Sequence, residues 1–132
     1  MFVDVSALLA MLLDEDEARI LAARLQGASQ RLTSPLAALR AAEGVSISLG
    51  LSLEDGEAAV RDFVELMGIK VMSLPAQLVT PASQALARFG AANGHPAALS
   101  RDDCLTYAAA RYYRLPLLYK GRAFAATDIE AA

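Results

Sequence analysis

Short apolar runs alternate along this chain with longer segments in which apolar residues recur every three or four positions. The short runs are typical of buried strands, and the longer segments are typical of helices that bury one face. The pattern predicts strands at 1–5, 31–33, 69–72 and 115–119, and helices at 7–13, 15–26, 34–49, 51–67, 80–93 and 100–113.

Short strands that alternate with longer helices indicate an α/β fold, with a short, mostly parallel central β-sheet surrounded by helices. The 132 residues fit one domain, 1–132, without internal repeats or low-complexity linkers. Sites in such sheets form at the carboxyl ends of the strands. We therefore look for chemistry directly after Val3, Thr33 and Leu118.

Composition narrows the choice of partners and compartment. A net charge of -3 argues against clamping of nucleic acid by a basic surface, but not against nucleic-acid chemistry run by metal ions. The 55% hydrophobic content predicts a homo-oligomer or a protein partner, with the helices at 15–26 and 52–67 as the groove for a partner helix. One cysteine, no apolar run long enough for a membrane span and no signal-peptide pattern favour the cytoplasm.

Three acids stand where a charge is costly or unusual. Asp4 ends a buried strand, where it either serves as a helix cap, pairs with a buried arginine or has a functional role. Glu43 falls on the apolar stripe of its helix, with pairing to Arg40 as the structural alternative. Asp103 completes a capping box with Ser100, which alone would explain it.

Asp4, Glu43 and Asp103 come from distant segments, and each stands at the end of an element or on a predicted buried face. Carboxylates that converge need a hard cation, for which Mg²⁺ or Mn²⁺ is the natural choice. We therefore expect these residues to form a metal site suited to phosphoryl chemistry.

The stretches 1–10, 101–108 and 115–129, with Glu43, resemble the VapC toxins, PIN-domain ribonucleases of bacterial toxin–antitoxin systems. The resemblance covers the whole chain and implies a PIN-like fold. It also implies Mg²⁺- or Mn²⁺-dependent endoribonuclease activity on RNA such as tRNA, a homodimer, and inhibition by a VapB-type antitoxin. Asp4, Glu43 and Asp103 would be the catalytic, metal-binding acids, and Ser6 matches the family's small hydroxyl residue two positions after the first acid.

The chain departs from the family pattern near its end, where Ala123 stands in place of a further acid. Asp128 is the nearest substitute, and Lys120 and Arg122 are candidate contacts to RNA phosphates, with solvated loop charge as their alternative. Two hypotheses follow. The chain is either a metal-dependent endoribonuclease toxin or a catalytically weakened PIN-like module that mainly binds antitoxin or RNA.

Overall fold

Four short strands form one parallel sheet in the order β3-β2-β1-β4 in the computed structural model, which covers residues 1–132. They are β1 (Phe2–Val3), β2 (Leu32–Thr33), β3 (Lys70–Val71) and β4 (Leu117–Leu118). β1 pairs on both sides, whereas β3 forms an exposed edge. All four predicted strands are confirmed, and so is the parallel α/β fold.

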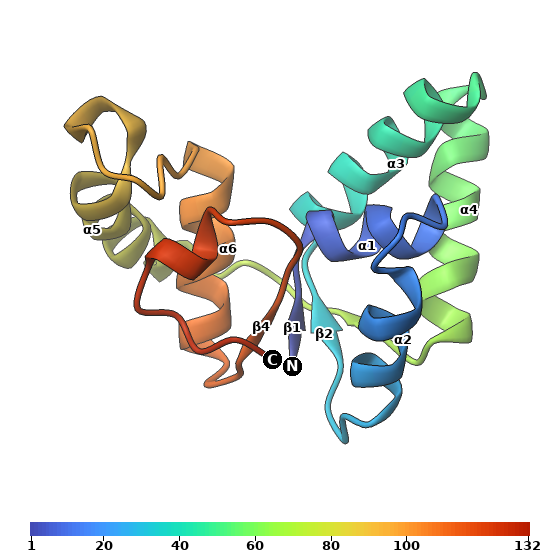
Figure 1. Ribbon diagram of the computed structural model, residues 1–132, viewed down its shortest axis with the longest axis horizontal. Helices are drawn as coiled ribbons and strands as arrows, with labels where there is room; N and C mark the ends of the chain where they lie inside the picture. Colours follow the sequence, from blue (N-terminus) through green and yellow to red (C-terminus); the bar gives the residue numbers. More distant parts are fainter.

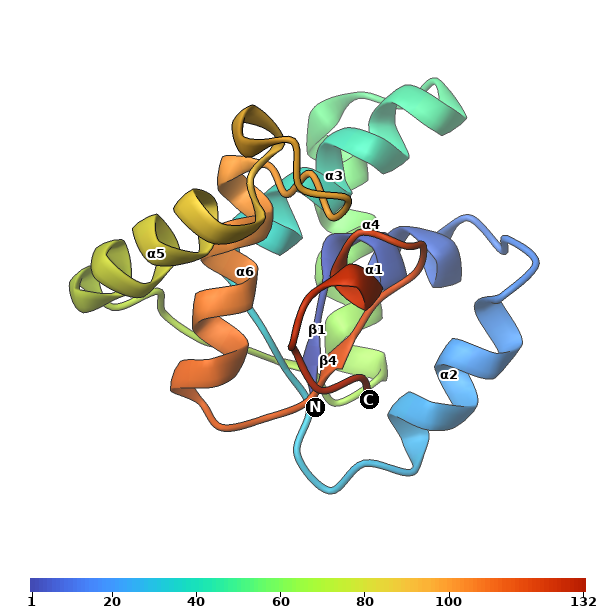
Figure 2. The same ribbon diagram turned by 60° about the vertical axis from the view of Figure 1, so that its left-hand side comes forward.

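Helices cover both faces of the sheet (Figure 1). They are α1 (Val5–Leu12), α2 (Ala18–Gln26), α3 (Pro35–Leu49), α4 (Leu53–Leu66), α5 (Val79–Phe89) and α6 (Arg101–Tyr112), with three 3₁₀ turns at Ala76–Leu78, Ala91–Asn93 and Phe124–Ala126. α1 to α4 pack on one side, and α5 and α6 on the other (Figures 1 and 2). None of these helices is long and apolar enough to cross a membrane.

The pleat of the strands divides the core into two halves. Phe2 and Leu117 point into the cluster under α5 and α6, and Val3 and Leu118 point into the cluster under α1 to α4. Side chains of a strand alternate between faces, and a sheet covered on both sides needs apolar residues at every position. This explains why the strands appear as uninterrupted apolar runs.

Three predicted helix boundaries are wrong. The helix expected at 7–13 begins already at Val5, because Asp4 is its N-cap. The helix expected at 15–26 begins only at Ala18, because Asp14 takes a left-handed conformation, φ 51°, and the chain first makes a turn. The helix expected to reach Asn93 ends at Phe89, because Gly90 becomes extended and pairs with Leu99. The chain then makes a separate 3₁₀ turn.

Small residues let α3 and α4 approach closely. Gly56 of α4 is buried, and a Cβ added there would lie 2.5 Å from the carbonyl oxygen of Ala42 on α3. That contact involves backbone, which cannot move aside easily. The spacing of these helices fixes the position of α3 and therefore of any site residue that it carries.

We expect Gly56→Ala to lower the free energy of unfolding by about 2 kcal/mol in urea denaturation, despite the better helix propensity of alanine. Gly44→Ala is the matched control, because its new Cβ meets only the flexible side chain of Leu9 and should cost less. Equal losses for the two variants would contradict the role of the α3–α4 backbone contact.

Candidate active site at the carboxyl edge of the sheet

The carboxyl ends of β1 and β2 carry an unusual concentration of buried polar groups. Four polar side chains are buried in the whole chain, and three of them, Asp4, Thr33 and Ser34, lie here. Thr33 donates a 2.8 Å hydrogen bond to the carbonyl oxygen of Val3, which ties β2 to β1. Ser34 caps α3 by accepting from the amide of Ala37. The edge predicted to hold the site is therefore polar inside an apolar core.

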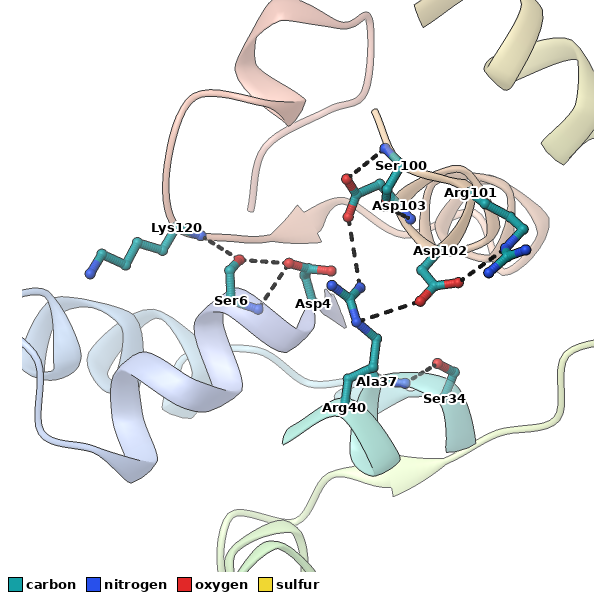
Figure 3. Close-up of polar contacts among 10 residues, drawn as sticks. All are labelled: Asp4, Ser6, Ser34, Ala37, Arg40, Ser100, Arg101, Asp102, Asp103 and Lys120. Carbon is teal, nitrogen blue, oxygen red and sulfur yellow. Dashed lines mark hydrogen bonds and ion pairs between the residues drawn. The ribbon is translucent and has the colours of Figure 1, made fainter. Parts of the chain in front are cut away.

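Asp4 is held by one carboxylate oxygen (Figure 3). Its Oδ2 accepts from the amide of Ser6 at 2.9 Å and from the hydroxyl of Ser6 at 2.6 Å. The Ser6 hydroxyl in turn accepts from the backbone amide of Lys120 at 2.9 Å. Asp4 thus caps α1, and Ser6 links this cap to the loop after β4.

The other oxygen of Asp4, Oδ1, is buried and has no hydrogen-bond partner. Burial raises the pKa of the Asp4 carboxyl, the hydrogen bonds from Ser6 lower it in part, and the nearby charge of Asp103 raises it again. A buried carboxylate oxygen without a partner is costly unless it gains a proton or a cation. Asp4 therefore has one oxygen that fixes its orientation and one that is free for a ligand.

The two carboxylate oxygens of Asp103 also have different partners. Oδ2 accepts from the amide of Ser100 at 3.0 Å, which closes the predicted capping box at the start of α6. Oδ1 lies 3.8 Å from Nη1 of Arg40. The capping box is confirmed and uses one oxygen only, so that it leaves the second free for the role that the sequence analysis predicted.

The residue that α3 contributes to this cluster is Arg40, which sequence reasoning considered only as a partner for Glu43. Its guanidinium lies 3.7 Å from Asp102 Oδ2 and 3.8 Å from Asp103 Oδ1 (Figure 3). Arg40 lies one helical turn before Glu43, and the sequence contains no signal that favours one of the two over the other.

The prediction that Glu43 lies on a buried face is wrong, because its side chain is exposed. The buried face of α3 consists of small residues, Ala37, Ala41, Ala42 and Val45. The larger apolar residues that suggested a core stripe are outside it, with Leu39 55% and Ile47 82% exposed. Accordingly, no three Asp, Glu, His or Cys side chains are grouped for metal binding.

Asp128 is engaged elsewhere. Its carboxylate accepts from the hydroxyl of Tyr107 and from Arg88 at 3.1 Å, and it lies 3.6 Å from Arg111. The hydrogen bond from Tyr107 and the two arginine charges lower its pKa. These contacts fasten the C-terminal segment to α5 and α6, and they do not bring Asp128 to Asp4.

The loop after β4 carries the predicted RNA contacts. Lys120 Nζ lies 3.2 Å from Glu15 and 3.3 Å from Glu17, so that its charge is already paired. Arg122 is exposed, and Ala123 is half-buried and offers no donor or acceptor on its side chain. Of the two cations, Arg122 is the more available to a phosphate.

Comparison with known proteins identifies relatives over the whole chain. The PIN domain profile matches residues 1–130. A VapC ribonuclease of Rhizobium meliloti is 36% identical, covering 97% of this chain and 98% of its own length. Ribonuclease VapC28 of Mycobacterium tuberculosis is 36% identical over 100% of this chain and 97% of its own, and Ribonuclease VapC of Mycolicibacterium smegmatis is 31% identical over 99% and 98%.

We expect Asp4→Asn to stabilise the protein by about 1 kcal/mol at pH 7 in EDTA, because it removes an unpaired buried charge. The raised pKa means that the folded state holds the proton more tightly than the unfolded state. The contribution of Asp4 to stability therefore falls as the pH rises above about 4, and the advantage of Asn should vanish towards that pH.

Urea unfolding between pH 4.5 and 8 measures this difference. Asp16→Asn, at an exposed acid of the same charge, is the control and should show no such pH trend. An Asp4→Asn protein less stable than the unsubstituted one at pH 8 would show that the free oxygen is not costly.

Proposed function

Because this chain belongs to the VapC ribonucleases of the PIN-domain family, the toxin endoribonucleases of toxin–antitoxin systems, we propose that it hydrolyses RNA phosphodiester bonds at the carboxyl edge of its sheet. Asp4 and Asp103 are the carboxylates that carry the reaction in this proposal. The observation that supports it most strongly is the buried, unpartnered Oδ1 of Asp4 beside the charge of Asp103. Such an oxygen is suited to a cation.

The family implies a divalent metal cofactor, and Mg²⁺ or Mn²⁺ suits oxygen ligands of this kind. One ion held by one or two carboxylates and completed by water is an ordinary arrangement for Mg²⁺. Asp4 and Asp103 each have one oxygen free of backbone hydrogen bonds, so that they fit one such ion. A bound ion would activate water and neutralise charge on the scissile phosphate.

The remaining residues act by positioning. Ser6 fixes the direction of Asp4 and connects it to the backbone of Lys120. The capping box fixes Asp103 at the start of α6. Arg122, exposed in the loop after β4, is the candidate contact to an RNA phosphate.

A groove lined by three helices is the candidate binding surface for a VapB-type antitoxin. It has a volume of about 240 Å³ and lies among α1, α2 and α4, where the sequence predicted a partner groove. Its apolar floor includes Met11, Ala22 and Phe63, with Arg19 at its border. An amphipathic helix is the natural occupant of such a groove.

We further propose a homodimer, for which the exposed Leu39 and Val71 beside the edge strand supply apolar surface. The cytoplasm, where RNA is available and Cys104 stays reduced, is the compartment in which we place this activity.

A second candidate function is a weakened PIN module that binds antitoxin or RNA without efficient cleavage. Two observations favour it. The site has no group of three acids, and Ala123 replaces the acid that the family pattern has near the end of the chain. The two candidates differ in the rate of RNA cleavage and share the same fold and partners.

We expect the purified chain to cleave RNA with Mg²⁺ or Mn²⁺, and EDTA, Asp4→Asn or Asp103→Asn to reduce the rate at least about 100-fold. Gel or sequencing analysis of total cellular RNA measures the cleavage, and Asp16→Asn serves as the charge-matched control. Cleavage that survives both EDTA and Asp4→Asn would refute metal-dependent hydrolysis at this site. Absence of cleavage, with RNA binding intact, would favour the second candidate.

We expect Ala123→Asp to raise the Mg²⁺-dependent cleavage rate at least about tenfold, because it restores a carboxylate in the loop beside the site. Ala125→Asp places the same charge at an exposed position of the 3₁₀ turn that follows Ala123 and should leave the rate unchanged. Equal rates for the two variants would show that position 123 takes no part in the reaction.

A further inference from the structure

α3 places the positively charged side chain of Arg40 beside the candidate active site. The only acid of α3, Glu43, is exposed, whereas Arg40 is half-buried and points at the start of α6. Figure 3 shows its guanidinium rising from α3 towards Asp102 and Asp103, with Asp4 on its other flank. The guanidinium thus places one positive charge beside the carboxylates of the candidate site.

The contacts of Arg40 are ion pairs without hydrogen bonds. Its Nε and Nη1 lie 3.7 and 3.8 Å from the nearest oxygens of Asp102 and Asp103, beyond ordinary hydrogen-bond lengths. The side chains of Arg40 and Asp102 are each 33% exposed, and that of Asp103 is 22% exposed. Solvent screens such pairs, so the guanidinium neutralises the acids without being locked between them.

The oxygen of Asp103 that Arg40 faces is Oδ1, the one that the capping box leaves free. It is also the only oxygen of Asp103 available to an ion shared with Asp4. A guanidinium and a divalent cation cannot both sit against this oxygen without strong mutual repulsion. Arg40 does not bond Asp4, whose Oδ1 stays without a partner.

We propose that Arg40 is the resident counter-ion of this acidic site and that a divalent cation must displace it from Asp103 in order to bind. This inference rests on the proposed function and adds to it a residue of this chain that sets the metal affinity. The charge of Arg40 weakens metal binding while it holds α3 against α6 in the metal-free protein.

Calorimetric titration of the full chain with Mn²⁺ tests the proposal. Arg40→Gln should bind Mn²⁺ at least about tenfold more tightly than the unsubstituted protein, because the competing charge is gone. Arg40→Lys keeps the charge and should stay within about threefold. Arg61→Gln, which removes an exposed arginine paired with Glu57 on α4, controls for net charge and should change nothing.

Thermal unfolding gives a second readout that does not depend on activity. In EDTA at low salt, Arg40→Gln should melt below the unsubstituted protein, because Asp102 and Asp103 lose their counter-ion. Mn²⁺ should then raise its melting temperature more than it raises that of the unsubstituted protein.

Equal or weaker Mn²⁺ affinity in Arg40→Gln would overturn the proposal, as would the absence of Mn²⁺ binding in every variant. Failure of the proposed function has a different signature. Tighter Mn²⁺ binding by Arg40→Gln without any RNA cleavage would support the counter-ion role and refute the nuclease activity. Metal-dependent RNA cleavage together with an unchanged Mn²⁺ affinity of Arg40→Gln would support the nuclease activity and refute the counter-ion role.

Discussion

The pairing of β1 with strands on both sides is the constraint on which the rest of the molecule depends. The amide of Phe2 donates to Pro116 and that of Asp4 donates to Leu118, so the ladder continues up to the acid itself. Asp4 directly follows this central strand, which helices cover on both faces, and it is 2% exposed. The unusual state of Asp4 therefore follows from strand order.

Convergence at this edge brings together residues far apart in the sequence. Parallel strands all end on the same side, and the helices that follow β1 and β2 begin there with a polar cap. Asp4 caps α1 and Ser34 caps α3, while the loop after β4 reaches Ser6 through the amide of Lys120. The same side chains therefore cap helices and belong to the candidate site. A change in the charge of such a side chain affects both the site and the start of the helix.

The sequence predicted the strands and the starts of several helices, but it did not predict which side chain of α3 faces the start of α6. Apolar runs and capping residues located all four strands and the starts of α3, α4 and α6, because these are local signals. Asp4 and Asp103 were chosen as candidate site residues because a buried strand end and a capping box are also local signals. The choice between Arg40 and Glu43 was not local, since it depends on which face of α3 packs against its neighbours.

The alanines on the buried face of α3 explain why the orientation of this helix was predicted incorrectly. The core face of α3 consists mainly of Ala37, Ala41 and Ala42, which carry little hydrophobic signal, whereas the larger Leu39 and Ile47 point to solvent. Periodicity weighted by side-chain size therefore rotated the helix incorrectly. The close approach at Gly56 is the tertiary fact that requires small residues there, and it is visible only when both helices are in place.

The double use of Asp103 has a consequence for how this position tolerates change. One oxygen of Asp103 caps the start of α6 and the other faces the candidate site. Two unrelated requirements therefore apply to the same residue. A residue that satisfied only the helix, such as Glu in the same box, would shift the second oxygen by a methylene. Loss of the chemistry would therefore release position 103 to any side chain that still closes the capping box, Glu included.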